Sequence, residues 1–277
     1  HLSIRRQRQM CIRDRVTLTG PPGTGKTRLA LEVASVMLPY YRDGVFWVPL
    51  APVNDPRLVL NSIAQHVGEM TESSGKSLLE TVQDKLRDKS LLLILDNFEH
   101  LLSAAPLVSE LLLAAPHLTV FVTSREALRL YGEHEFPVDP LQLPERDHAR
   151  SPEDLQAYEA IDLFVQRARA VEPDFALDNA NAASVVAICA HLDGLPLAVE
   201  LAAARIRYYA PQNLLIRLSS RLEALAGGPR DLPARQRTLR ATLAWSYDLL
   251  DDGEKRLFAR LGIFVNGCSR AAAQAIC

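Results

Sequence analysis

The chain has 277 residues and a formal net charge of −2, with 48% apolar and 23% charged residues. This length predicts two or three domains, and the near-zero charge gives no argument for nucleic acid or an anionic membrane as a partner. No apolar run approaches the roughly 18 residues of a membrane span, no signal-peptide pattern opens the chain, and the cysteines lack metal-binding spacing, so we expect a cytoplasmic protein without a membrane partner.

The first residues are strongly basic. Residues 1–15 carry arginines against the single acid Asp14 and show no helix or strand period. A basic arm for nucleic acid is one interpretation; we favour a disordered or non-native tail at residues 1–14, because charge runs are usually solvated. The chain starts with His1 and stops inside a helical pattern, so we expect both ends to be truncated.

Residues 20–27 read Gly-Pro-Pro-Gly-Thr-Gly-Lys-Thr, a complete G-x-x-x-x-G-K-[ST] phosphate-binding loop. An apolar run at residues 16–19 precedes it and a helical pattern at residues 28–34 follows, which is the context that the motif needs. We expect Lys26 to reach the β- and γ-phosphates of a nucleoside triphosphate and the Thr27 hydroxyl to bind Mg²⁺. The residues expected at the nucleotide are Gly20, Pro21, Pro22, Gly23, Thr24, Gly25, Lys26, Thr27 and Arg28.

Strands and helices alternate up to about residue 140. The strand patterns after the first lie at residues 44–48, 91–96, 118–123 and, more briefly, 135–138. The helical patterns between them lie at residues 57–67, 77–86 and 99–115. This order predicts right-handed βαβ units and a parallel sheet that is covered by helices on both faces.

Asp96 ends a buried strand and fits the Walker B position, where a carboxylate holds Mg²⁺ through water. A helix cap is the alternative role for this acid. The next position, where many hydrolysing relatives have a Glu, is Asn97, which cannot take a proton. Glu99 is a candidate substitute, or else a first-turn acid of the helix predicted at residues 99–115. We therefore expect slow hydrolysis or none.

Arg125 follows the strand at residues 118–123, beside the strand that ends in Asp96. An Arg at this position is placed to touch a γ-phosphate and so to distinguish ATP from ADP. A surface Arg in a connecting loop is the alternative.

Beyond residue 150 the strand patterns fade and helices are predicted. The predicted helices lie at residues 155–168, 180–192, 195–209, 238–249 and 253–261. Gly194 and Pro196 suit a tight turn between two of them, and residues 227–229 mark a boundary.

Five motifs occur together in this order: GPPGTGKT at 20–27, LLLILDNFEH at 91–100, VTSRE at 122–126, GLPLA at 194–198 and TLRATLAWSYDLL at 238–250. With them, residues 15–277 resemble the ATPase core of the STAND (NB-ARC-like) signal-transduction NTPases. The version in bacterial transcriptional regulators of the LuxR-type and antibiotic-regulatory groups is the most similar. The resemblance implies an α/β P-loop NTPase three-layer sandwich with a parallel sheet, followed by a helical domain and the start of a winged-helix domain.

The resemblance also implies domain boundaries and roles. It places the nucleotide-binding domain at residues 15–148, an ARC1-like helical domain at 149–228 and a truncated winged-helix domain at 229–277. Arg125 matches the sensor-I arginine, and Pro196 is expected to contact the adenine. The implied function is a switch between ATP and ADP that self-associates in the ATP state and contacts DNA only through domains absent from this chain.

Two other hypotheses remain open at this stage. A turnover ATPase of the AAA+ remodelling kind would need a catalytic Glu beside Asp96, and Asn97 argues against it. A degenerate scaffold would hold one nucleotide permanently. A small-molecule kinase is disfavoured, because no acceptor site is recognisable in the sequence.

Overall fold

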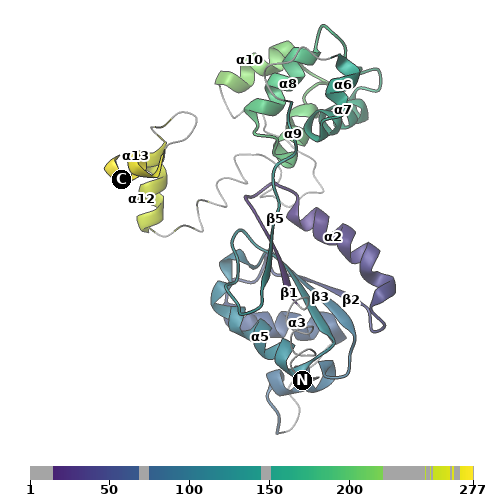
Figure 1. Ribbon diagram of the computed structural model, residues 1–277, viewed down its shortest axis with the longest axis vertical. Helices are drawn as coiled ribbons and strands as arrows, with labels where there is room; N and C mark the ends of the chain where they lie inside the picture. Colours follow the sequence, from purple (N-terminus) through teal and green to yellow (C-terminus); the bar gives the residue numbers. More distant parts are fainter. Residues whose placement is uncertain are drawn as a thin grey trace, which may run out of the picture. The chain divides into compact units, whose positions relative to one another are not determined.

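The computed structural model describes residues 15–68, 75–144, 151–220, 252–262 and 269–276, together with residues 247, 250 and 264 (Figure 1). The chain divides into two compact units between Pro140 and Leu141. The boundary that the sequence predicts, after residue 148, lies outside the described residues. The division comes earlier because Leu141 and Leu143 pack with the second unit.

The first unit is built on a parallel five-stranded sheet with the strand order β2-β3-β4-β1-β5. Its strands are β1 (Arg15–Thr19), β2 (Val45–Pro49), β3 (Leu91–Asp96), β4 (Leu118–Thr123) and β5 (His134–Pro137). Strand β4 pairs with both β1 and β3, so the strand preceding the phosphate-binding motif and the strand ending in Asp96 are separated by one neighbour. The parallel sheet predicted from the sequence is confirmed.

Burial along the strands follows their position in the sheet. All six residues of the interior strand β3 are buried, as its continuous apolar run predicts. Strand β5 lies at the edge and is exposed along its whole length, and it ends at Pro137. A proline that cannot donate a ladder hydrogen bond is tolerated at such an edge. This explains why the fifth strand gives the weakest pattern in the sequence.

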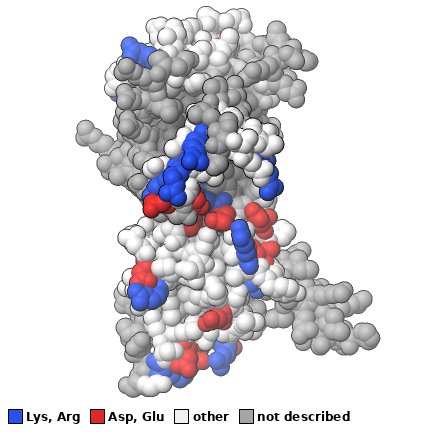
Figure 2. Space-filling model, turned by 90° about the vertical axis from the view of Figure 1, so that its left-hand side faces the viewer, with Lys and Arg blue, Asp and Glu red and all other residues white. Residues whose placement is uncertain are grey.

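Charged side chains of both signs are interspersed on the face of the molecule that Figure 2 presents. Within the described residues of this view, Lys and Arg lie close to Asp and Glu. This mixture agrees with the net charge of −2. It is not the continuous basic surface that binds nucleic acid.

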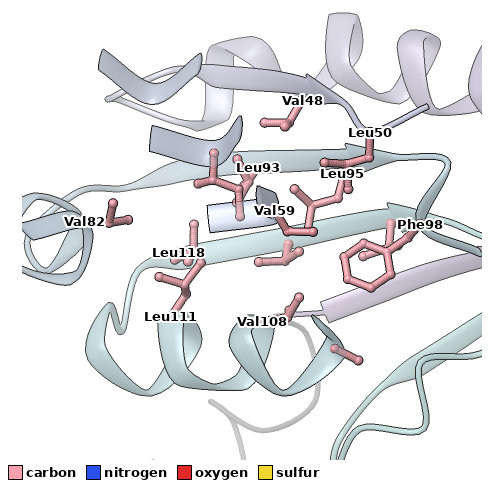
Figure 3. Packing of buried hydrophobic residues seen from close by; sticks show 14 of the residues in the cluster. Val48, Leu50, Val59, Val82, Leu93, Leu95, Phe98, Val108, Leu111 and Leu118 are labelled. Carbon is pink, nitrogen blue, oxygen red and sulfur yellow. The ribbon is translucent and has the colours of Figure 1, made fainter. Parts of the chain in front are cut away.

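Helices cover the two faces of the sheet and complete three layers (Figure 1). The helix α2 (Lys26–Met37) packs on one face over Leu92 and Ile94 of β3. On the other face, Leu91, Leu93 and Leu95 pack under α3 (Val59–Gly68), α4 (Leu78–Leu86) and α5 (Ala105–Ala114) (Figure 3). Successive residues of a strand point to opposite faces, so one apolar run contributes to both cores. Each fully buried Leu contributes about 1.5–3 kcal/mol to folding.

The helix predicted at residues 99–115 is wrong over its first part. Two short 3-10 turns, η3 (Phe98–His100) and η4 (Leu102–Ala104), precede α5, which begins at Ala105. Pro106 lies in the first turn of α5, where its missing N–H has no partner to lose, but farther inside a helix it would break the hydrogen-bond ladder. A similar 3-10 turn, η2 (Pro56–Leu58), precedes α3.

The second unit is helical throughout its described part up to residue 220, which confirms the predicted helical region. Its helices there are α6 (Pro152–Gln156), α7 (Glu159–Val171), α8 (Ala182–His191), α9 (Pro196–Ala203) and α10 (Pro211–Ser220). They enclose an apolar core that includes Phe164, Ile188, Val199 and Leu214. Helix α9 ends at Ala203, earlier than the predicted residue 209.

The turn between α8 and α9 holds the segment that enters the second unit. Gly194 has a φ of +63°, and a Cβ atom at this position would lie 2.4 Å from the carbonyl oxygen of Leu141. The backbone N–H of Leu141 donates to the carbonyl oxygen of Gly194 at 3.0 Å. Pro196 occupies the first turn of α9, as predicted.

The described residues beyond 246 include the helices α12 (Asp252–Leu261) and α13 (Arg270–Ile276). Most of residues 221–251 lie outside the described residues, and so do residues 1–14. The winged-helix start expected at residues 229–277 and the tail expected at residues 1–14 therefore stay predictions.

We expect Gly194→Ala to lower the free energy of unfolding of the helical unit by at least about 2 kcal/mol, because both the positive φ and the Leu141 carbonyl oppose a Cβ atom. Chemical denaturation followed by circular dichroism measures this change. Gly75→Ala is the matched control, since Gly75 has a φ of +92° with nothing within 4 Å. Equal losses for the two variants would contradict the proposed crowding at Gly194.

Candidate functional site

The loop between β1 and α2 has the backbone conformation of an anion-binding turn. Gly25, with a φ of +91°, caps α2 without any side-chain hydrogen bond to the helix N-terminus. Free N–H groups at a helix N-terminus attract negative charge. Gly20 has a φ of +142°, and a Cβ atom there would lie 2.7 Å from the carbonyl oxygen of Val138 on the β5 side. The Thr24 hydroxyl donates to the carbonyl oxygen of Pro21 at 3.0 Å and closes the turn.

Lys26 turns back over this loop. Its Nζ donates to the carbonyl oxygens of Gly20 at 2.6 Å and Pro21 at 2.9 Å. Burial lowers the pKa of Lys26 to about 8; the carboxylates of Glu99 and Asp96 oppose this shift and the Arg125 guanidinium adds to it. A buried ammonium of this kind is stabilised by an anion. The loop thus presents N–H donors and a cation to one place, which fits a phosphate group.

Asp96 joins three segments through its side chain. Its Oδ1 accepts hydrogen bonds from the Thr27 hydroxyl at 2.8 Å and from the Thr123 hydroxyl at 2.6 Å. The Thr123 hydroxyl oxygen in turn accepts from the backbone N–H of Asn97 at 2.9 Å. The carboxyl ends of parallel strands meet at one edge of the sheet, which brings Asp96 and Thr123 beside the start of α2.

Thr123 is a site residue that the sequence reasoning missed. It is buried at the end of β4, and its hydroxyl is the direct link between β4 and the turn after β3. Its position in the sequence could have indicated this role, since Thr123 is the last residue of the strand that pairs with the Asp96 strand. The sequence prediction that Thr27 and Asp96 lie together is consistent with their hydrogen bond.

The backbone conformation at Asn97 disfavours a Glu directly after Asp96. Asn97 has a φ of +66°, a left-handed conformation that Asn adopts more readily than Glu. The next acid, Glu99, lies in the turn η3 with a side chain only 6% exposed. The helix that would have made Glu99 a first-turn acid begins at Ala105 instead. Glu99 therefore lies in a short 3-10 turn and not in the first turn of α5.

Glu99 and Arg125 form a buried ion pair. The Arg125 Nε lies 3.5 Å from Glu99 Oε1, and the Arg125 side chain is 21% exposed. Among the residues that the structure describes, no group hydrogen-bonds to Glu99 Oε2. Both side chains act electrostatically on Lys26, so Lys26, Asp96, Glu99 and Arg125 form one charged group at the carboxyl edge of the sheet.

The remaining predicted residues lie in two places. Pro22 and Gly23 belong to the loop, and Arg28 belongs to the first turn of α2. Pro196 belongs to the second unit, so its contact with an adenine stays a prediction.

Two further surveys concern the described residues only. No group of three or more His, Cys, Asp or Glu side chains there could hold a metal ion by itself. None of the helices in the described ranges has the length and apolar character needed to cross a membrane.

Comparison with known proteins identifies the first unit. Residues 13–131 match the model of a protein family described as an AAA domain. The match covers the phosphate-binding loop, the Asp96 strand and Arg125. The first unit is therefore a P-loop ATPase domain of the AAA kind, and such domains bind nucleotides.

Relatives in mycobacteria match nearly the whole chain. A Mycobacterium tuberculosis protein named "Putative HTH-type transcriptional regulator Rv0890c" is 41% identical over 262 residues, which are 94% of this chain and 28% of that protein. Another M. tuberculosis protein, named "Uncharacterized protein Rv0894", is 39% identical over 262 residues, or 63% of its length. The chain thus spans between about a quarter and two thirds of these curated relatives.

Solved structures give more distant likenesses. A STAND protein with a tetratricopeptide repeat sensor from Pyrococcus horikoshii aligns over 97% of this chain and 36% of its own, with 16% identity and a TM-score of 0.43. A structure of Drosophila ORC bound to DNA aligns over 95% of this chain and 75% of its own, with 14% identity and a TM-score of 0.51. The ORC likeness concerns the fold alone. The AAA-domain match agrees with the P-loop ATPase core that the sequence motifs predict.

We expect Thr123→Val to lower the free energy of unfolding by about 1–3 kcal/mol, because the Asn97 N–H and the Asp96 carboxylate both lose a buried partner. Thr123→Ser keeps the hydroxyl and is the control. Urea denaturation of the three proteins measures the difference. A serine variant as unstable as the valine variant would contradict this role of the hydroxyl.

We expect ADP binding to take up a proton near pH 8. The lowered pKa means that free Lys26 loses its proton as the pH rises through about 8, and a bound phosphate restores it. Calorimetry in buffers of different ionisation enthalpy should report about half a proton taken up at pH 8 and less than about 0.2 at pH 7. Equal proton uptake at the two pH values would contradict the lowered pKa.

Proposed function

We propose that this chain is the ATP/ADP-binding switch core of a STAND-type signalling protein, the regulatory ATPase part of a bacterial transcriptional regulator. The observation that carries the proposal is the direct contact of Thr27 with Asp96, beside a buried Lys26 and the Glu99–Arg125 pair. This arrangement combines donors for phosphates with a side chain that is able to respond to the third phosphate.

The loop residues fit a nucleotide phosphate chain. The N–H groups at the start of α2 and the Lys26 ammonium would hold the β-phosphate in both states, with the loop residues and Arg28 around it. The hydroxyl of Thr27 and the carboxylate of Asp96 are oxygen ligands of the kind that Mg²⁺ prefers. When bound, Mg²⁺ would neutralise charge on the phosphates.

Arg125 would distinguish the two nucleotides. It follows β4, directly beside the Asp96 strand, and its guanidinium is partly buried against Glu99. A guanidinium binds phosphate oxygens in a bidentate manner. A nucleotide shifts a conformational equilibrium only if it binds one arrangement better, and Arg125 would supply that difference for ATP.

Slow hydrolysis fits the residues after Asp96. Asn97 cannot accept a proton, and the carboxylate of Glu99 is paired with Arg125. Glu99 is nevertheless the one observation that favours a turnover ATPase of the AAA+ remodelling kind, because it is an acid within the electrostatic reach of Lys26. That alternative requires Glu99 to act as general base at a high rate.

The second unit would carry the response. In the switch, ADP would hold the helical unit and a winged-helix module against the sheet, with Pro196 at the adenine. ATP would release them and permit self-association. The mycobacterial relatives extend well beyond the region matched here, and one is named as an HTH-type regulator, so we propose that DNA contacts belong to such further regions.

We expect Lys26→Ala to weaken ADP and ATP binding by more than about 100-fold, because a phosphate loses its only buried ammonium partner in the described site. Equilibrium titration with a fluorescent nucleotide measures the loss. Lys89→Ala is the matched control, since Lys89 pairs with Asp43 at the surface. In the full-length protein, signalling should be lost together with binding; signalling that persists in a variant shown not to bind nucleotide would contradict the switch.

A further inference from the structure

The Glu99–Arg125 ion pair connects the segments that follow two neighbouring strands, β3 and β4. Glu99 follows β3 in η3, and Arg125 follows β4. Their charged groups are 3.5 Å apart, and the Glu99 side chain is almost completely buried. Burying two charges is unfavourable unless the pair is close and each remaining atom has a partner.

The pair does not satisfy that condition. Glu99 Oε1 lies 3.5 Å from Arg125 Nε, and Oε2 is buried with no hydrogen bond from any residue that the structure describes. A buried carboxylate oxygen without a donor is costly. The fold does not depend on this contact to join β3 and β4, because the Thr123 hydroxyl already links Asp96 and Asn97. The pair is therefore an arrangement that a better partner would easily replace.

We propose that Glu99 and the γ-phosphate of ATP compete for Arg125. Glu99 holds the guanidinium when the site is free or contains ADP, and the γ-phosphate takes it when ATP binds. This inference rests on the proposed function and adds to it: Glu99 is a positioning residue that acts through Arg125 and lowers the preference for ATP.

The competition follows from the chemistry of the three groups. A phosphate offers oxygens in a geometry that matches the guanidinium fork and carries more negative charge than a carboxylate. Arg125 must break its contact with Glu99 before it binds the γ-phosphate. The loss of the Glu99 contact therefore offsets part of the free energy gained from the γ-phosphate. ADP has no γ-phosphate and leaves the pair unchanged. Glu99 thus sets how much ATP is needed to overcome ADP.

The test is the ratio of two affinities. Dissociation constants for Mg²⁺–ADP and for a non-hydrolysable Mg²⁺–ATP analogue are measured for the unaltered chain, Glu99→Gln, Arg125→Gln and the double variant. The ratio is required because removing a carboxylate near Lys26 raises the affinity for both nucleotides. Glu99→Gln should raise the preference for the ATP analogue about tenfold, and Arg125→Gln should abolish the preference.

The double variant and two further variants complete the experiment. In the Arg125→Gln background, Glu99→Gln should leave the ratio unchanged, because no guanidinium remains to be released. Glu99→Ala should raise the ratio like Glu99→Gln. Glu126→Gln makes the same charge change next to Arg125, but its carboxylate pairs with the exposed Arg129 at 3.7 Å, so it should have no effect on the ratio.

The outcomes separate this inference from the proposed function. If Arg125→Gln lowers the ATP preference but the Glu99 variants leave it unchanged, the switch stands and the competition is wrong. If Glu99→Gln raises the preference equally with and without Arg125, its effect is not exerted through Arg125 and the inference is overturned. If the unaltered chain binds neither nucleotide, the proposed function itself fails.

Discussion

The carboxylate of Asp96 is the interaction on which the arrangement of the first unit depends. Its Oδ1 accepts hydrogen bonds from Thr27 at the start of α2 and from Thr123 at the end of β4. The backbone oxygen of Asp96 accepts a third from the N–H of Leu50, after β2. One residue thus holds together the ends of three neighbouring strands and the helix that follows the phosphate-binding loop. A change in the charge of the Asp96 carboxylate therefore affects the start of α2 and the end of β4, which both donate to it.

A second constraint lies where the two units are joined in the chain. A Cβ atom at Gly20 would lie 2.7 Å from the carbonyl oxygen of Val138. A Cβ atom at Gly194 would lie 2.4 Å from the carbonyl oxygen of Leu141. The first glycine of the phosphate-binding motif and the glycine of the helical turn therefore both accommodate the same short segment. Only residues 139 and 140 separate Val138 from Leu141 in the chain.

Much of this could be predicted from the sequence, because the signals were local. The apolar run at residues 91–95 and the glycines of residues 20–27 determine their own backbone almost regardless of context. The first part of the helix predicted at residues 99–115 was wrong, because two 3-10 turns, η3 and η4, occupy that stretch before α5 begins at Ala105. The roles of Thr123 and Glu99 depend on side chains that are distant in the sequence, and periodicity contains no information about those. Thr123 contacts Asp96, and Glu99 pairs with Arg125; only the structure shows that these residues lie together.

We propose that nucleotide binding, more than turnover, is the output of this site. Steady-state phosphate release at saturating Mg²⁺–ATP tests it most directly, in a preparation whose nucleotide occupancy is measured in parallel. With Asn97 after Asp96 and Glu99 paired with Arg125, we predict full occupancy and a release rate below about 0.01 per second, as in nucleotide switches. Several turnovers per second would contradict the account and identify Glu99 as the general base of a working ATPase.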